Sequence, residues 1–266
     1  MYILEIEGDE EDVAARLFLT KTTGSTWDNG VVSAYFESEQ DRDAALDLLG
    51  DFTTRKIDAD RVDWLELYQQ SLEPLFIGER FVVAPDASLI PPGSDRLPLV
   101  IPQEQAFGTG SHETTSLCIE LLESIDLRGK RGLDIGAGSG ILALAMLRLG
   151  ASKVFAFDND LDAYAALREN AMRNQLPLVA FIGGIEALRG AELDVATMNI
   201  VPEVIIPILP HVRTQELIVS GVLTERRDEV KAAMRGFRIA AEKTKGEWWA
   251  AHAVRRGGRP RPPGAA

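Results

Sequence analysis

The spacing of hydrophobic residues divides the chain into regions with different patterns. The first region has four short apolar strands and two amphipathic helical segments: strands at 2–6, 22–27, 31–36 and 53–58, and helices at 9–19 and 38–49. Asn29 and Gly30 separate the second strand from the third, and such a pair predicts a hairpin because both residues tolerate positive φ. The order β-α-β-β-α-β predicts a small α+β domain with a ferredoxin-like arrangement over residues 1–58.

A helical pattern at residues 61–73 connects this region to the rest of the chain. Apolar residues recur there at helical spacing from Trp64 to Leu72, and Pro74 ends the pattern. We therefore expect a linker helix over residues 59–74. Two further strands and a surface loop are expected after it: strands at 75–85 and 97–101, and a loop at 86–98.

From about residue 112, strands and helices alternate regularly. Five strands and five helices are predicted here: strands at 131–135, 153–157, 178–182, 193–198 and 216–220, and helices at 113–124, 141–149, 161–174, 202–211 and 225–235. This alternation predicts a doubly wound α/β sheet with both faces covered by helices. An antiparallel pair at 237–243 and 248–254 is expected to close the domain, which spans 75–254. The last stretch, 255–266, lacks a hydrophobic pattern and is expected to be a disordered tail.

Composition narrows the possible classes of protein. The 266 residues carry a formal net charge of −13, which disfavours direct binding to nucleic acid or anionic lipid. This charge is compatible with a basic protein substrate, and the alternative, which we favour, is simply a soluble acidic protein. No stretch approaches the ~18 apolar residues of a membrane helix, and the N-terminus lacks the features of a signal peptide. The single cysteine, Cys118, excludes an intrachain disulfide and is expected to be buried. We therefore expect a cytoplasmic protein, and the spacing of its histidines indicates no metal site.

The strongest chemical signal is the glycine-rich segment Gly136–Gly140, between a buried-strand pattern and a helix that begins at Ile141. Glycines at such a turn let the backbone approach a ligand closely. Ile141 stands where the dinucleotide fingerprint GxGxxG/A needs a small residue. The observed GxGxG spacing instead resembles that of proteins that bind S-adenosylmethionine. Together with Asp134, this glycine loop predicts a nucleoside-binding site, and the alternative is a tight turn without a ligand.

Asp158 and Asn199 each end a predicted strand at the sheet edge where ligands bind in such folds. Asp158 follows the first glycine of the loop by 22 positions, a spacing at which a carboxylate accepts hydrogen bonds from ribose hydroxyls. The alternative is capping of the following helix, a role that we favour for Asp160. Asn199 either orients a substrate amine or caps the helix that begins at Pro202. The residues after Met198 depart from the Asn/Asp-Pro-Pro-aromatic run of many adenine and glutamine methylases, which argues against a base-flipping enzyme.

Residues 107–115 are dense in glycine and hydroxyl groups and precede an apolar helix. One interpretation is a capped helix start with a flexible lead-in. The other is a lid that closes over the cofactor.

These segments together resemble the bacterial PrmA family, which methylates protein eleven of the large ribosomal subunit. The resemblance covers residues 60–254 and rests on motifs at 106–115, 134–143, 170–174 and 198–200, with further similarity at 63–74 and 78–85. It implies a Rossmann-like, S-adenosylmethionine-dependent methyltransferase that acts on lysine or N-terminal amines of that ribosomal protein. It also implies that the N-terminal domain holds the substrate, and we expect the protein to be a monomer.

Carried over by position, the resemblance implies a set of cofactor-binding residues. Phe107 and Gly108 would lie on the lid, and the remaining contacts would come from Thr115, Asp134, Gly136, Gly138, Asp158 and Asn199. Asn199 is also the candidate for orienting the substrate amine. Two other functions remain open: methylation of another lysine-bearing protein or a small amine, and cofactor binding without activity.

Overall fold

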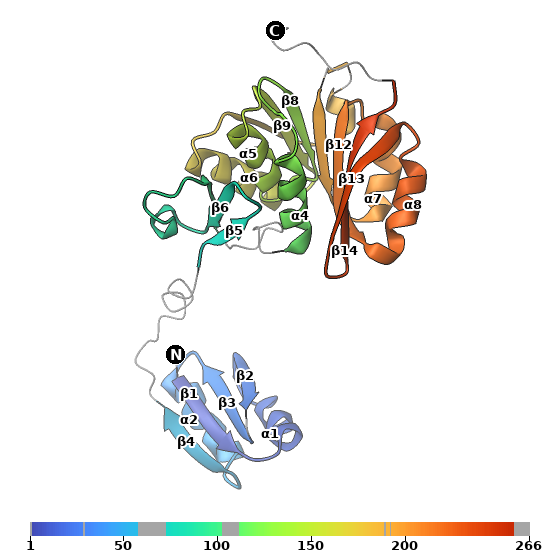
Figure 1. Cartoon of the computed structure of the whole chain (residues 1–266). Helices are drawn as coiled ribbons and strands as arrows, with labels where there is room; N and C mark the ends of the chain where they lie inside the picture. Colours follow the sequence, from blue (N-terminus) through green and yellow to red (C-terminus); the bar gives the residue numbers. More distant parts are fainter. Residues whose placement is uncertain are drawn as a thin grey trace. The chain divides into compact units, whose positions relative to one another are not determined.

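Two units make up the chain, Met1–Ser71 and Leu72–Ala266, and each is described by itself (Figure 1). The computed structural model describes residues 2–28, 30–57, 73–102, 112–188, 190–191 and 193–257. The predicted linker helix and most of the predicted tail therefore lie outside the described residues.

The N-terminal unit is a four-stranded antiparallel sheet in the order β2-β3-β1-β4, accompanied by two helices. Its elements are β1 (Tyr2–Glu7), α1 (Glu10–Leu17), β2 (Gly24–Asp28), β3 (Val31–Phe36), α2 (Glu39–Leu48) and β4 (Thr53–Ile57). The predicted order of elements is confirmed, and Asp28 pairs with Val31 across the predicted two-residue connection. Alternate residues of β1 and β3 are buried and form the core of this unit with the inner sides of both helices.

The second unit begins with a small three-stranded sheet in the order β5-β6-β7 (Leu75–Ile77, Phe81–Ala84 and Leu97–Val100). The prediction of one strand at 75–85 is wrong, because a turn at Gly78 divides this segment into two antiparallel strands. Gly78 has a φ of +55°, which favours glycine. The Glu123 carboxylate accepts hydrogen bonds from the Glu79 and Arg80 amides at 2.9 Å each, so a residue distant in sequence holds the turn.

The main sheet has seven strands in the order β10-β9-β8-β11-β12-β14-β13. The strands are β8 (Arg131–Ile135), β9 (Lys153–Asp158), β10 (Leu178–Ile182), β11 (Val195–Asn199), β12 (Glu216–Leu223), β13 (Phe237–Lys245) and β14 (Trp248–Arg255). The strands from β10 to β12 in this order are parallel, and β14 is antiparallel to both of its neighbours. The closing antiparallel pair is confirmed, and β14 is the member of that pair that lies next to β12.

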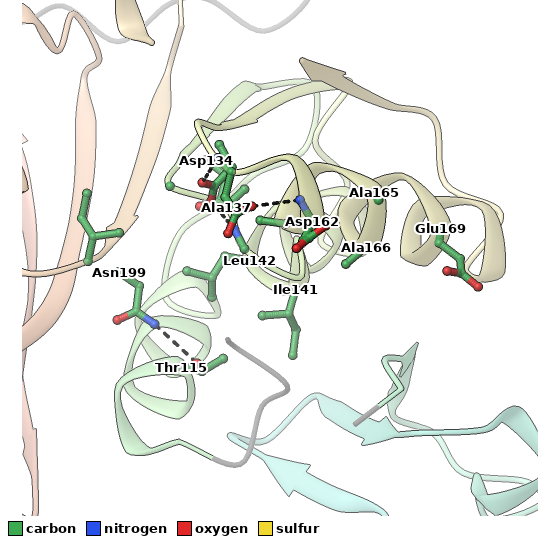
Figure 2. A pocket seen from close by; sticks show the side chains of 16 residues that line it. Thr115, Asp134, Ala137, Ile141, Leu142, Asp162, Ala165, Ala166, Glu169 and Asn199 are labelled. Carbon is green, nitrogen blue, oxygen red and sulfur yellow. Dashed lines mark hydrogen bonds between the residues drawn. The ribbon is translucent and has the colours of Figure 1, made fainter. Parts of the chain in front are cut away.

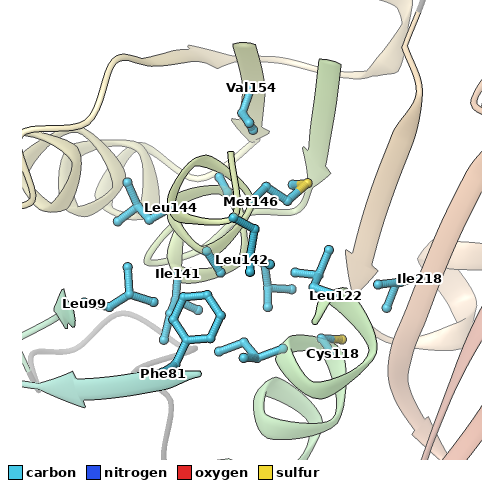
Figure 3. Close-up of a cluster of buried hydrophobic side chains, with 14 of the residues drawn as sticks. Phe81, Leu99, Cys118, Leu122, Ile141, Leu142, Leu144, Met146, Val154 and Ile218 are labelled. Atoms are coloured by element: carbon cyan, nitrogen blue, oxygen red, sulfur yellow. The ribbon is translucent and has the colours of Figure 1, made fainter. Parts of the chain in front are cut away.

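Helices cover both faces of this sheet, which confirms the doubly wound prediction (Figure 1). The helices are α4 (Glu113–Leu122), α5 (Ile141–Arg148), α6 (Leu161–Arg173), α7 (Pro202–Ile208) and α8 (Arg227–Ala233), and the short 3-10 helices are η1 (Ala87–Leu89), η2 (Ile185–Leu188), η3 (Leu209–His211) and η4 (Thr224–Arg226). Helices α4, α5 and α6 contribute to one apolar core, and α7 and α8 to the other. Cys118 lies in the first core, where burial raises the pKa of its thiol (Figure 3).

The last strand extends into the segment predicted to be a tail. Arg255 ends β14, and its guanidinium donates hydrogen bonds to the carbonyls of Thr214 (2.7 Å) and Val212 (2.6 Å). It also lies 4.5 Å from the centroid of the Phe237 ring. The strand therefore ends one residue after the predicted strand at 248–254, because polar contacts of an arginine leave no hydrophobic pattern.

Within the described ranges, no helix has the length and apolar character needed to cross a membrane. The same residues bring together no group of three His, Cys, Asp or Glu side chains that could hold a metal ion. His252 instead lies 2.9 Å from one oxygen of Glu216, whose other oxygen accepts from Lys130 at 2.5 Å.

Candidate active site

A cavity of about 820 Å³ lies at the carboxyl ends of β8, β9 and β11 (Figure 2). Its walls come from the glycine loop, the segment after β9 with part of α6, the end of β11, and α4. Six of the predicted site residues line it: Thr115, Asp134, Gly136, Gly138, Asp158 and Asn199. Phe107 and Gly108 lie outside the described residues, so the lid stays a prediction.

Three glycines determine the shape of the glycine loop. Gly136, Gly138 and Gly140 have φ values of +66°, +52° and +79°, which other residues rarely adopt. A Cβ atom would lie 2.6 Å from Ile200 Cγ2 at Gly136 and 2.2 Å from Leu167 Cδ1 at Gly140. Backbone conformation and close packing therefore both require glycine in this loop.

Asp158 ends β9 and turns its carboxylate toward the glycine loop. One oxygen accepts a hydrogen bond from the Gly138 amide (2.9 Å) and the other from the Asp160 amide (3.1 Å). The side chain is half-buried in the cavity wall, and each oxygen retains capacity to accept from a ligand. Asp160 is the N-cap of α6 and accepts from the Asp162 amide at 2.9 Å, which confirms its capping role.

Asp134 lies beneath the glycine loop and is only 1% exposed. Its carboxyl accepts hydrogen bonds from the Thr197 hydroxyl on β11 (2.6 Å) and from the Ala143 amide in α5 (3.1 Å). Burial raises the pKa of the Asp134 carboxyl to about 7, although both hydrogen bonds act in the opposite direction. Asp134 thus connects β8, α5 and β11, and its contact with a cofactor stays a prediction.

Asn199 ends β11 and faces Thr115, a fully buried residue of α4 (Figure 2). Its Nδ2 donates to Thr115 Oγ1 at 3.4 Å. Its Oδ1 is buried without a hydrogen-bond partner in the described part of the chain, although buried polar atoms are nearly always paired. The N-cap of α7 is Val201, so the alternative capping role of Asn199 is wrong. An unpaired acceptor in a cavity wall is expected where a ligand supplies the donor.

Two buried asparagines support the site, Asn170 in α6 and Asn174 at its C-cap; both belong to the motif at 170–174, which by itself assigned neither of them a role. Asn170 Nδ2 donates to the carbonyl of Ser139 in the glycine loop at 2.9 Å. Asn174 accepts from the amide of Val100 in β7 and donates to its carbonyl, both at 2.8 Å. Because Asn174 Nδ2 also donates to the Asn170 carbonyl (2.8 Å), the two residues connect β7 to the glycine loop. Their i,i+4 spacing is the signal that could have identified them.

The described end of the 107–115 segment fits the interpretation of a capped helix start. His112 is the N-cap of α4, and its ring nitrogen accepts from the Thr114 amide at 3.3 Å. The His112 ring also packs edge-on against Trp248, with 4.9 Å between centroids. The lid interpretation concerns the residues before 112, which the structure does not describe.

The sheet order, the helices on both faces and the cavity at the carboxyl edge define a Rossmann-like methyltransferase fold, preceded by a separate antiparallel sheet. The family model described as "Ribosomal protein L11 methyltransferase (PrmA)" matches residues 4–256. The chain belongs to this family of S-adenosylmethionine-dependent methyltransferases, as the sequence motifs predicted.

Individual relatives agree with this assignment. The ribosomal protein L11 methyltransferase of Symbiobacterium thermophilum is 37% identical over 177 residues, which cover 65% of this chain and 58% of that protein. The enzyme of the same name from Pelobacter propionicus is 34% identical over 245 residues, covering 82% of this chain and 79% of that protein. The solved ribosomal protein L11 methylase of Lactobacillus delbrueckii subsp. bulgaricus has a TM-score of 0.63 at 24% identity, and covers 69% of this chain and 98% of its own. This last similarity supports the fold.

Proposed function

We propose that the cavity binds S-adenosylmethionine, and the unpaired Oδ1 of Asn199 is the observation that carries this proposal. Among the residues that the structure describes, none donates to this buried acceptor, and it lies in a cavity where the cofactor's amine and hydroxyl groups can supply a donor. Asp158, at the end of β9, would accept hydrogen bonds from the ribose hydroxyls of the cofactor. The remaining proposed contacts are Phe107, Gly108, Thr115, Asp134, Gly136 and Gly138.

We propose that lysine or N-terminal amines of ribosomal protein L11 receive the methyl group. The relatives carry this substrate in their names. The net charge of −13 suits a basic protein substrate better than a polyanion.

The bound cofactor supplies a methyl group that is already activated, so the chain needs no covalent intermediate and must mainly align the amine. A lysine with a pKa near 10.4 must first lose its proton, which costs about 4 kcal/mol at pH ~7.4. A partly dry site reduces this cost because it disfavours the ammonium form. Asn199 and the Thr115 hydroxyl are the polar groups that we place near the amine. Loss of the proton to water before transfer requires no general base.

For the N-terminal unit we propose a ferredoxin-like substrate-recognition domain over residues 1–58, connected through residues 59–74 to the catalytic domain at 75–254. The β-α-β-β-α-β order and the strand order β2-β3-β1-β4 support this proposal. We further propose that the protein acts in the cytoplasm as a monomer, without direct contact to nucleic acid.

Labelling with methyl-tritiated S-adenosylmethionine tests the proposed function. The protein is incubated with purified ribosomal protein L11 and, separately, with a lysate of cells that lack their own enzyme. We expect one labelled band, L11, and little label with Asp158→Ala at subsaturating cofactor. Label on another protein, or only on small amines, would show that this other molecule is the substrate and that L11 is not. Tight binding of the cofactor without methyl transfer to any acceptor would show that the protein is a cofactor-binding module and not an enzyme.

A further inference from the structure

Strand β12 is irregular beside the end of β11. Its pairing with β14 shifts in register between Val219 and Val222. Ser220 and Gly221 therefore face a single residue of β14, which is the arrangement of a β-bulge. On its other side β12 pairs with β11, where Ser220 is the partner of Asn199. The bulge thus lies directly beside the strand end that carries Asn199, and bulges next to active sites commonly redirect the chain or a side chain.

Gly221 determines the shape of this bulge. Its φ is +78°, a value that favours glycine. A Cβ atom at this position would lie 2.4 Å from the carbonyl oxygen of Ile200, and 2.8 Å from its carbonyl carbon and from its amide nitrogen. These are backbone atoms, which cannot swing aside as the end of a side chain can. Only glycine therefore lets β12 approach the backbone of Ile200, the residue that follows Asn199.

Ile200 connects this contact to the glycine loop. Its side chain lines the cavity, and its Cγ2 would lie 2.6 Å from a Cβ atom at Gly136. Ile200 is thus held between two glycines of positive φ, with its backbone against Gly221 and its side chain against Gly136. Because Asn199 and Ile200 share a peptide bond, the position of the Ile200 backbone limits where Asn199 can place its side chain.

The side chain of Asn199 has little else to hold it. Its hydrogen bond from Nδ2 to Thr115 is 3.4 Å long, which is longer than usual for an N–H donor. Its Oδ1 accepts from no described residue. The direction of the Asn199 amide is therefore set mainly by the backbone on which it stands.

We propose that Gly221 is a positioning residue for the cofactor site. The bulge fixes the backbone of Ile200, and through it the direction in which the Asn199 Oδ1 faces the cavity. Gly221 itself is not among the described residues that line the cavity, so it acts through Asn199. This inference rests on the proposed function, under which the Asn199 Oδ1 accepts a hydrogen bond from S-adenosylmethionine.

Calorimetric titration of the full-length protein with S-adenosylmethionine tests the inference. Gly221→Ala should raise the Kd by about 10-fold, because a donor of the cofactor loses a well-placed acceptor. Gly129→Ala is the matched control, since Gly129 has a φ of +74° and an added Cβ would meet no described atom within 4 Å beyond its chain neighbours. Both variants should lower the thermal unfolding midpoint through backbone strain, but the control should keep the wild-type Kd. A merely structural role of Gly221 would leave the Kd unchanged in both.

A double-mutant cycle shows whether Gly221 acts through Asn199. Gly221→Ala/Asn199→Ala should bind the cofactor within about twofold of the Kd of Asn199→Ala, because effects that pass through one group do not add. Ser220→Ala is a milder variant that decides the question should Gly221→Ala fail to fold. It removes the hydrogen bond from the Ser220 hydroxyl to the Trp249 carbonyl (3.1 Å) across the bulge. It should raise the Kd by about two- to fivefold in the wild-type background and leave it unchanged in Asn199→Ala.

The possible outcomes separate this inference from the proposed function. If Asn199→Ala weakens binding but Gly221→Ala keeps the wild-type Kd, or if the two effects add, the positioning role is refuted while the proposed function stands. The same holds if Gly221→Ala does not fold and Ser220→Ala keeps the wild-type Kd. If Asn199→Ala itself binds the cofactor like the wild-type protein, the proposed role of Asn199 is refuted and the inference with it.

Discussion

Replacing Asp134 with asparagine should make the stability of the catalytic unit less dependent on pH. Burial raises the pKa of the Asp134 carboxyl from 3.8 to about 7 in the folded protein. Between these values the folded state binds more protons at this site than the unfolded state. The contribution of Asp134 to stability is therefore fully present below the unfolded pKa and is lost as the pH rises through the folded pKa.

The size of the effect follows from the two pKa values. A difference of about 3 units corresponds to about 4 kcal/mol of unfolding free energy, of which about 2–3 kcal/mol is lost between roughly pH 5 and pH 8. Asparagine should fit the site, because its carbonyl can accept from the Ala143 amide and its Nδ2 can donate to Thr197 Oγ1. The Thr197 hydroxyl can then turn to the Leu133 carbonyl, which lies 3.4 Å away.

Hydrogen exchange of the β8 and β11 amides, measured by mass spectrometry across this pH range, reports on the catalytic unit specifically. The opening free energy of the wild-type protein should fall relative to that of Asp134→Asn as the pH rises. Asp126→Asn is the control, since Asp126 is an exposed carboxyl whose pKa is lowered to about 2 by Arg128. A difference between wild type and Asp134→Asn that is constant with pH, or that grows in favour of the wild type, would refute the reasoning.

Three other substitutions test the proposed cofactor site. Asp158→Ala should weaken S-adenosylmethionine binding by roughly 1–3 kcal/mol, measured by calorimetry, because it removes the proposed ribose acceptor; wild-type affinity would contradict that role. Asn199→Ala should lower kcat/KM for methyl transfer by about 10- to 100-fold, since it removes the buried acceptor; steady-state rates equal to wild type would eliminate Asn199 from the site. Asn170→Ala should raise the cofactor Kd by about fivefold, because it removes the side-chain hydrogen bond to the Ser139 carbonyl and loosens the glycine loop. Asn174→Ala is its comparison, since it breaks the contacts to Val100 and to the Asn170 carbonyl but keeps the direct hydrogen bond from Asn170 to the loop; an equal or larger effect of Asn174→Ala on Kd would contradict the role of Asn170.

Most elements of both units follow from local patterns in the sequence. A strand or helix with one buried face must place its apolar residues at a period of 2 or 3.6, and this period is visible without any tertiary information. The exceptions arise where polar contacts between distant residues decide the backbone. Glu123 holds the turn at Gly78, and Arg255 extends β14 by contacts with carbonyls near the start of β12.

The sequence by itself determined that a glycine loop follows a buried strand, that a carboxylate ends the next strand, and that these features resemble a methyltransferase. These are local properties, because positive φ requires glycine and a strand end is marked by its neighbours. Only the tertiary structure decided which side chains meet. Asn199 and Thr115 are 84 positions apart and come together because α4 packs against β11 and β12. The order of strands arises from packing between distant segments, so the burial of Asp134 and of the Asn199 oxygen, to which no described residue donates, appears only once the sheet is assembled.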